Sequence, residues 1–307
     1  MLPRLPVSAF ITEVGPRDGL QSEGATIPTA SKIRLVNALS RTGLRRIEVT
    51  SFVHPRVMPS MADAEEVMRS IERIPGVSYS ALVPNVRGAE RAVAAGADEL
   101  NVVLSATESF NRRNLNMSIA ESVANYRAIA ETARAAGRRA AVGLSVCYGC
   151  PYEGEVTTRA VVEVTDRLVD VGADEIAYAD TIGVADPLLV ARLIEELRPR
   201  WPDLSIGLHF HDTRGLGLAN VLAGVTGGVA RFDASVGGIG ACPFAPGATG
   251  NVCTEDLVHM LESMGVGTGV DVDTLTRCAG LLCDLVGHDV PSRMLRAGTS
   301  ARALRRP

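Results

Sequence analysis

Two histidines separated by a single residue are the first candidates for chemistry. His209 and His211 lie in the segment Leu-His-Phe-His-Asp at 208–212, directly after an apolar run. Because side chains alternate between the two faces of a β-strand, both imidazoles would point to the same side. An isolated histidine is most often structural, but two on one face of a strand end can form half of a divalent-metal site. The pair therefore predicts a metal centre at the end of a strand.

A charged pair follows the first apolar run of the chain. Arg17 and Asp18 stand in the segment Gly-Pro-Arg-Asp-Gly at 15–19, which we expect to be a loop just past a strand. Taken alone, such a pair can be an ordinary salt bridge. At a metal centre, Asp18 would supply the anionic oxygen that a hard divalent cation prefers. Arg17 would aim a fixed positive charge at a developing oxyanion.

Glu48 is an acidic residue within an otherwise apolar and β-branched run at 46–52. A carboxylate buried inside a fold is costly unless it is paired. Arg17 is the partner that we expect, so Glu48 would orient the guanidinium for its catalytic task. A purely structural ion pair between the two residues is an equally good interpretation.

The segment 237–251 is rich in glycine and proline, which is typical of a shaped functional loop and not of a packed element. Cys242 within it can be an inert small hydrophobe. Above a cationic site, it becomes a candidate proton carrier, because positive charge lowers the pKa of a thiol. Asn251 at the end of the loop can be a helix N-cap, or it can offer an amide oxygen to a metal.

The elements that must position these residues show a regular alternation of short apolar runs and longer amphipathic stretches, which predicts a parallel sheet with crossover helices. We expect strands at about 9–14, 46–52, 78–83, 98–104, 140–147, 174–179, 204–210 and 231–236. We expect helices at about 29–43, 62–73, 87–96, 118–137, 157–171, 186–199, 216–228 and 253–264.

Eight such units in 307 residues favour a (β/α)8 TIM barrel, of the α/β class, over an open doubly wound sheet. We expect a single domain over residues 1–307, with the barrel at about 8–265 and an extra C-terminal helix and cap at about 270–307. In a TIM barrel the C-terminal ends of the strands form the site. The histidine pair, the Arg-Asp pair and the glycine-rich loop all follow predicted strands, so they would meet at one mouth.

The composition excludes several classes of partner. A net charge of −4 gives no general attraction to nucleic acid or to an anionic membrane, and no apolar run of about 18 residues predicts a membrane span. Six cysteines without a secretory signal favour a reduced, cytoplasmic protein. Cys147 and Cys150 form a C-x-x-C that can be a redox pair or half of a zinc site, but no second pair completes a zinc cluster. We also expect a homo-oligomer, such as a dimer.

Seven blocks in order carry a resemblance to a known family. They are Glu-Val-Gly-Pro-Arg-Asp-Gly-Leu-Gln at 13–21, Ile-Glu-Val-Thr-Ser-Phe-Val at 47–53, Pro-Ser-Met-Ala-Asp at 59–63, Gly-Cys-Pro-Tyr-Glu-Gly at 149–154, Asp-Thr-Ile-Gly-Val at 180–184, His-Phe-His-Asp-Thr at 209–213, and the loop 237–251 with Thr-Glu-Asp-Leu at 254–257. On these blocks the chain, over about residues 8–290, resembles the 3-hydroxy-3-methylglutaryl-CoA lyases of the DRE-TIM metallolyases.

The resemblance implies a metal-dependent carbon–carbon lyase that cleaves (S)-3-hydroxy-3-methylglutaryl-CoA (HMG-CoA) to acetoacetate and acetyl-CoA by retro-Claisen cleavage. It implies an acyl-CoA as the substrate and Mg²⁺ or Mn²⁺ as the cofactor, although two histidines and one aspartate also resemble a non-haem iron site. The implied metal ligands are Asp18, His209, His211 and Asn251. The implied catalytic residues are Arg17 against the thioester enolate, Cys242 as acid and base, His209 as a second candidate for the base, and Glu48 as support.

Two departures from the best-known animal enzymes leave the substrate open. Arg214 stands where those enzymes carry an aromatic residue, and Val57 replaces a tryptophan. Both would lie along the acyl-CoA path, so the chain could instead be a lyase for a longer 3-hydroxy-3-carboxymethyl acyl-CoA. The nearest rival is a Claisen-condensing synthase of the same superfamily, but those enzymes differ in the loop that here carries Cys242. A catalytically inactive scaffold protein is a second rival, which the site does not support, because all the expected polar groups are present.

Overall fold

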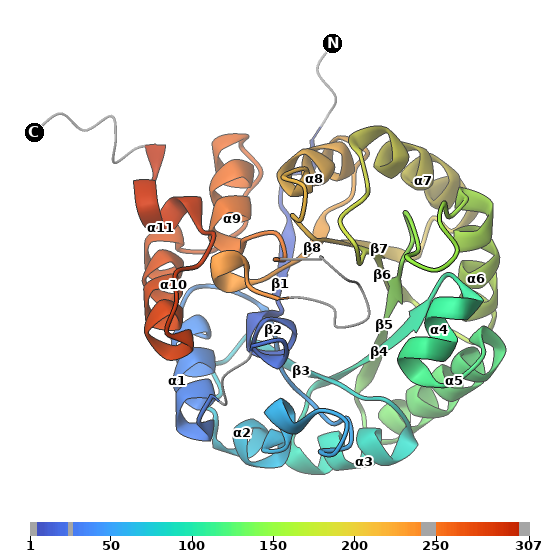
Figure 1. Cartoon of the computed structure of the whole chain (residues 1–307), viewed down its shortest axis with the longest axis horizontal. Coiled ribbons are helices and arrows are strands. Elements are labelled where there is room, and N and C mark those ends of the chain that lie inside the picture. Colours follow the sequence, from blue (N-terminus) through green and yellow to red (C-terminus); the bar gives the residue numbers. More distant parts are fainter. Residues whose placement is uncertain (1–4, 24–26, 241–249, 301–307) are drawn as a thin grey trace, which may run out of the picture.

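A computed structural model describes residues 5–23, 27–240 and 250–300 of the chain. Eight parallel strands pair in sequence order, and β8 closes onto β1 to form a barrel (Figure 1). The strands are β1 (Phe10–Glu13), β2 (Arg46–Ser51), β3 (Ser78–Leu82), β4 (Glu99–Ser105), β5 (Arg139–Ser145), β6 (Glu175–Asp180), β7 (Ser205–Phe210) and β8 (Arg231–Ala234). The predicted TIM barrel is confirmed, and one observed strand overlaps each predicted range.

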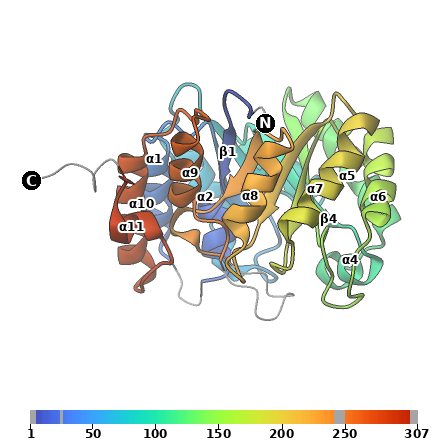
Figure 2. The same cartoon turned by 90° about the horizontal axis from the view of Figure 1, so that it is seen from above.

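Helices follow the strands and form a ring outside the barrel (Figures 1 and 2). They are α1 (Thr29–Leu39), α2 (Ala64–Ser70), α3 (Val86–Ala95), α4 (Glu108–Leu115), α5 (Ile119–Ala135), α6 (Thr158–Asp170), α7 (Pro187–Arg200), α8 (Gly217–Thr226), α9 (Thr254–Ser263), α10 (Val272–Val286) and α11 (Arg293–Ala297). The eight predicted helices correspond to α1–α3 and α5–α9. The predicted extra C-terminal helix is α10.

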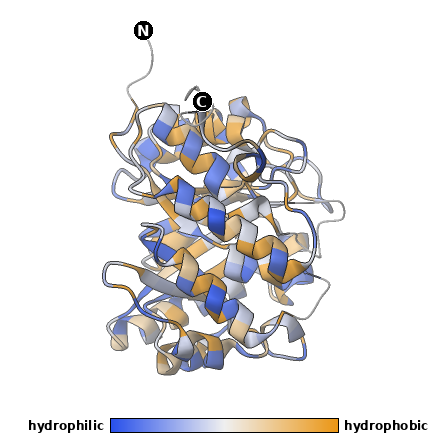
Figure 3. Ribbon diagram, turned by 90° about the vertical axis from the view of Figure 1, so that its left-hand side faces the viewer, coloured by the Kyte–Doolittle hydropathy of each residue, from blue (hydrophilic) through white to orange (hydrophobic). Residues whose placement is uncertain are grey.

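Local sequence explains where several helices begin and which face they bury. Ser118 and Glu121 form a capping box that satisfies the first turn of α5, and Asp271 accepts hydrogen bonds from two amides at the start of α10. Figure 3 shows hydrophobic and hydrophilic residues interspersed along the outer helices. The apolar face of each helix packs on the outward-facing side chains of the strands, such as Leu100 and Val102 of β4, which are buried. The main core therefore lies between the barrel and the ring of helices.

The structure adds two helices that the sequence pattern did not predict. The residues of α4 are mostly polar, and only Phe110 and Asn111 of this helix are buried, so it carries no apolar periodicity. The short α11 follows α10 in the chain and packs against it. Ser292 caps the first turn of α11. Across the three described ranges, no helix is long and apolar enough to cross a membrane.

The N-terminal end of the barrel is closed by a charged floor. It consists of the first residues of four strands, Arg46, Glu99, Glu175 and Arg231. The guanidinium of Arg46 pairs with Glu175 and lies 2.6 Å from Glu99, and that of Arg231 lies 2.9 Å from Glu175. The ring of Phe10 stacks against both guanidinium groups. The floor is thus a buried, charge-paired plug.

Candidate metal centre and active site

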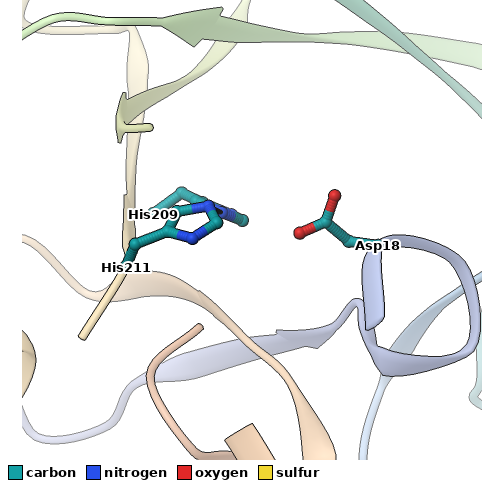
Figure 4. A group of neighbouring side chains, drawn as sticks. All are labelled: Asp18, His209 and His211. Carbon is teal, nitrogen blue, oxygen red and sulfur yellow. Dashed lines mark hydrogen bonds between the residues drawn. The ribbon is translucent and has the colours of Figure 1, made fainter. Parts of the chain in front are cut away.

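Three predicted metal ligands meet at the opposite end of the barrel. One ligand atom each of Asp18, His209 and His211 lies within 4.8 Å of the other two, and no other group of this kind occurs among the described residues. Figure 4 shows the carboxylate of Asp18 facing the two imidazoles. The Nε2 atoms of the two histidines are 3.4 Å apart. The predicted proximity of these three side chains is present in the structure, and their role as metal ligands stays a prediction.

The local fold explains how Asp18 reaches this point. The segment Gly15–Gly19 is not the open loop that the sequence suggested, because it winds into one π-helical turn, η1, directly after β1. The amides of Arg17 and Asp18 both donate to the carbonyl of Val14. A Cβ at Gly15 would lie 2.6 Å from Glu13, and one at Gly19 would lie 2.7 Å from Ile239. Only glycine at these positions lets the turn pack this tightly.

Asn251 supplies the test of whether these residues suit a cation. Its Nδ2 donates to Asp18 Oδ2 at 2.8 Å and to the carbonyl of Ile239 at 3.1 Å. Its Oδ1 is buried and accepts no hydrogen bond from any described residue. A buried amide oxygen without a partner is costly, and a bound cation would satisfy it. The interpretation of Asn251 as a helix N-cap is wrong, because Cys253 is the N-cap of α9.

Arg17 lies between two carboxylates at the edge of the ligand group. Its Nε donates to Glu48 Oε2, and its Nη1 lies 2.5 Å from Asp18 Oδ1. Asn101 holds the other oxygen of Glu48 with a 2.8 Å hydrogen bond. The predicted pairing of Arg17 with Glu48 is therefore present. Glu48 is 1% exposed, so this contact fixes the guanidinium from the barrel interior.

The charges around the site set the protonation states of Asp18 and His211. Burial acts to raise the pKa of Asp18, but the positive charges of Arg17 and His209 outweigh it and lower this pKa to about 2. Burial, together with the nearby His209, lowers the pKa of His211 to about 4. Asp18 is thus an anion and His211 is neutral at physiological pH, and these are the forms that bind a cation.

Asp233 on β8 is a further member of the site, and the sequence analysis did not identify it. Its Oδ2 lies 3.4 Å from Nδ1 of His209, and the two residues are register partners on adjacent strands. Burial acts to lower the pKa of His209, yet the contact with Asp233 raises it above its ordinary value. An acceptor at Nδ1 keeps the proton there and turns the Nε2 lone pair toward Asp18.

Glu13 is a second residue that the sequence analysis did not single out. It appeared there only as the first residue of the block at 13–21. This fully buried carboxyl group accepts hydrogen bonds from the amides of Gly15 and Val236 at 2.7 and 2.8 Å, and from the hydroxyl of Thr254 at 2.7 Å. It therefore connects the start of η1, the end of β8 and the start of α9. We interpret Glu13 as the structural brace of the mouth.

Cys242 lies outside the described residues, within the gap at 241–249, so its predicted position is not tested. The two ends of this segment lie at the site. A Cβ on Gly240 would be 2.3 Å from Asn251 Nδ2 and 3.4 Å from Asp18 Oδ2. The amide of Gly250 donates to the carbonyl of Gly240 at 2.7 Å. The described residues on either side of the segment that contains Cys242 thus lie beside the predicted ligands.

A single cavity of about 260 Å³ connects these groups. Arg17, Asp18, Glu48 and both histidines line it, and so does Val57, which is 75% exposed at the rim. Arg214 is not among the lining residues; its Nη1 donates to the carbonyls of Ile182 and Gly183, both at 2.9 Å. The mouth is therefore open at the position of Val57, and Arg214 ties two neighbouring loops together.

The C-x-x-C pair lies away from this chemistry. Cys147 and Cys150 are both buried and unbonded to each other, and the thiol of Cys147 donates to the carbonyl of Leu144. Burial raises the pKa of Cys147 far above its ordinary value. A protonated, buried thiol is neither a good metal ligand nor a reactive nucleophile. The structure therefore supports neither a redox pair nor a zinc half-site here.

Known proteins resemble this chain in both fold and sequence. The HMGL-like family model matches residues 9–282. A hydroxymethylglutaryl-CoA lyase of Bacillus subtilis is 44% identical over 96% of this chain and 99% of its own, and a cytoplasmic 3-hydroxy-3-methylglutaryl-CoA lyase of Mus musculus is 45% identical over 98% of this chain and 88% of its own. A solved HMG-CoA lyase of Acinetobacter baumannii, in complex with coenzyme A and 3-methylmalate, superimposes with a TM-score of 0.93 at 43% identity, covering 98% of both chains. The chain belongs to the HMGL-like family.

Proposed function

We propose that this protein is a carbon–carbon lyase that cleaves HMG-CoA to acetoacetate and acetyl-CoA. The observation that carries the proposal is the meeting of Asp18, His209 and His211 with an unpartnered oxygen of Asn251, directly beside the guanidinium of Arg17. Such an arrangement supplies both a cation site and a fixed positive charge. The family membership supports the same reaction, since relatives named as HMG-CoA lyases cover nearly the whole chain.

The proposed cofactor is Mg²⁺ or Mn²⁺, held by Asp18, His209, His211 and Asn251. The carboxylate and amide oxygens, without a thiolate, suit these cations, whereas two imidazoles with one carboxylate would also suit Fe²⁺. When bound, a divalent cation polarises the substrate oxygens that it contacts and lowers the pKa of a hydroxyl group.

The residues of the chain would then divide the retro-Claisen cleavage between them. Cys242 removes the proton of the C3 hydroxyl. The second candidate, His209, would have no free ring nitrogen once Nε2 holds the cation and Nδ1 keeps its proton toward Asp233. The C2–C3 bond breaks, its electron pair passes to the thioester as an enolate, and acetoacetate is released. Cys242, or a water molecule that it relays, returns a proton to C2 to give acetyl-CoA. Each proton that leaves the substrate is thereby matched by one that returns.

Arg17 is the proposed stabiliser of the enolate. A guanidinium has five N–H donors. Two of them point at Glu48 and Asp18, which fixes the plane of the group and leaves donors for a substrate oxygen. Because Glu48 reaches the guanidinium from below, its role is to position Arg17. Burial and fixed orientation strengthen this stabilisation, since little reorganisation is required as charge develops.

The test uses the full chain, freed of metal and then loaded with Mg²⁺ or Mn²⁺. With HMG-CoA, we expect acetoacetate and acetyl-CoA in equal amounts, only in the loaded sample. Condensation of acetyl-CoA with a 2-oxo acid, without cleavage, would instead favour a Claisen-condensing synthase. Metal binding without turnover of either kind would favour a scaffold. The expected homo-oligomer and cytoplasmic location stay predictions, which light scattering and cell fractionation would check.

A further inference from the structure

The inner wall of the barrel is unusually open on one side. Along β4, β5 and β6, the inward-facing residues are partly exposed, whereas the outward-facing ones, such as Val102, Leu144 and Ile176, are buried. The partly exposed inward positions are Asn101, Val103, Ala141, Gly143, Ala177 and Ala179. In a TIM barrel the inward positions usually interlock as layers of bulky branched side chains. Here they border a hollow.

The hollow arises from a layer of small residues between the mouth and the floor. One level above the floor, the odd-numbered strands contribute Thr12, Ser80, Ala141 and Gly207 to the barrel interior. None of these side chains is large enough to reach the axis. On the next level toward the mouth, β6 contributes Ala177, whose methyl group is too small to fill its share of the barrel interior. The strand register pairs it with Gly143, which has no side chain at all.

The cavity that contains the ligand group continues into this hollow. The same cavity is lined by His209 at the mouth, by Ala141 and Ala177 in the middle, and by Arg46 and Glu175 of the floor. A Cβ built on Gly143 would meet only Val103, at 3.4 Å, so the space beside it is free. The interior below the site is therefore continuous with the place where the substrate would react.

The charges of the interior indicate which part of a substrate belongs there. The nucleotide of coenzyme A is large and polyanionic, so it must leave through the open mouth beside Val57. Below the ligand group, the carboxylates of Glu48, Asp233 and Glu175 line the cavity. The guanidinium groups of Arg17 and Arg46, which also line it, are already paired with carboxylates of the protein. A substrate carboxylate would be repelled there. Of the groups on C3 of the substrate, the uncharged substituent is therefore the one that fits below the ligand group.

We infer that the barrel interior is a subsite for the C3 substituent of the acyl-CoA, and that it accepts an aliphatic chain of several carbons in place of the methyl group of HMG-CoA. This inference rests on the proposed lyase reaction. The chain runs past Gly143 and Ala177 toward Ala141. It ends above the floor, because contact with Arg46 and Glu175 would strip water from a buried ion pair.

The chemistry of such a substrate balances in the same way as for HMG-CoA. The hydroxyl proton on C3 leaves, the C2–C3 bond breaks, and C2 takes up a proton. The products are acetyl-CoA and a 3-oxo acid that keeps the long substituent. No oxidant or second substrate is required.

The experiment compares HMG-CoA with 3-butyl-3-hydroxyglutaryl-CoA on the metal-loaded full chain. We expect the wild type to cleave both, with kcat/KM values within about tenfold of each other. Ala141→Leu fills the hollow and should lower the ratio of kcat/KM for the butyl compound to that for HMG-CoA by at least about tenfold. Ala141→Ser keeps the volume and should change this ratio by less than about twofold. Ala177→Val is the second filling variant, and Mn²⁺ binding verifies that each variant is folded.

The outcomes separate the two claims. Cleavage of HMG-CoA together with a butyl compound more than about a hundredfold poorer would overturn the subsite but keep the lyase. Cleavage of both compounds, with a ratio that neither filling variant changes, would overturn the placement of the chain in the barrel interior. Turnover of neither compound would overturn the proposed function, and the inference with it.

Discussion

The two ends of the barrel each hold a buried arginine between two carboxylates, yet they differ in what surrounds the ion pairs. At the floor, Arg46 contacts Glu99 and Glu175, and an aromatic ring covers the group. At the mouth, Arg17 contacts Asp18 and Glu48. Only the mouth adds atoms with free lone pairs, namely those of two imidazoles and one amide oxygen. A buried ion pair is thus a plug at one end and part of a reactive centre at the other.

The largest expected effect is the loss of metal at the mouth. Asp18→Ala removes the anionic ligand, so we expect Mn²⁺ affinity to fall by more than about a hundredfold and cleavage to become undetectable. Isothermal titration calorimetry measures the affinity. The matched control is Glu99→Ala, which removes a carboxylate from an arginine at the floor and should leave metal affinity unchanged. Equal losses in both variants would erase the distinction between the two ends.

Arg17→Gln should separate rate from metal binding. We expect kcat to fall by about 10²–10³, which is the usual effect of removing one oxyanion donor, while Mn²⁺ affinity stays within about threefold. Steady-state kinetics at saturating metal gives the first quantity, and calorimetry gives the second. Near-normal turnover of this variant would remove Arg17 from the mechanism.

At the floor, Glu175→Ala should change stability and not metal binding. It leaves Arg46 and Arg231 without their shared partner, and breaking a buried pair typically costs about 3–5 kcal/mol of unfolding free energy. Urea denaturation measures the loss. The folded fraction should bind Mn²⁺ as the wild type does, and weaker binding would mean that the floor also shapes the centre.

Asp233→Asn should have a smaller effect at the mouth. Without the anionic acceptor, Nδ1 of His209 is held less firmly in the tautomer that presents Nε2, so we expect Mn²⁺ affinity to fall by about 10–100-fold. Asp63→Asn, which weakens an ion pair with Lys32 away from the cavity, is the control. Unchanged Mn²⁺ affinity in Asp233→Asn would show that Asp233 does not position His209 for metal binding.

The smallest expected effect is a pH-dependent difference at the brace. Burial raises the pKa of Glu13 to about 8, from an ordinary value of 4.5. Because the folded state favours the protonated form, the wild type should lose stability as the pH rises from 4.5 through 8. Glu13→Gln mimics the neutral form, so its advantage in thermal stability over the wild type should grow over that range. A constant difference from pH 5 to pH 9 would contradict this assignment.

Periodicity was enough to predict the barrel and the convergence of its ligands. The alternation of faces along β7 placed His209 and His211 together, and the rule for strand ends placed Asp18 opposite them. Glu13 could not be found in this way, because its partner Thr254 lies 241 residues further along the chain. Asp233 carried one usable signal, since it is an acidic residue at an inward position of the strand next to His209.

Other misses have local causes. The segment Gly15–Gly19 contains two glycines and a proline, which are typical of a loop, whereas tight packing against Glu13 and Ile239 selects a π-helical turn. The hollow could not be predicted from single strands, because Ala141 or Gly143 alone does not reveal what faces it across the barrel. Only the combined register of the strands shows that small residues gather at one level.

The most direct test is a crystal structure of the full chain with Mn²⁺, with the ion located by its anomalous scattering. We predict one peak bonded to an Asp18 carboxylate oxygen, to one ring nitrogen each of His209 and His211, and to Asn251 Oδ1. A peak at the floor, or a fully loaded protein whose ion does not touch both histidines and Asp18, would contradict the assignment of the metal centre.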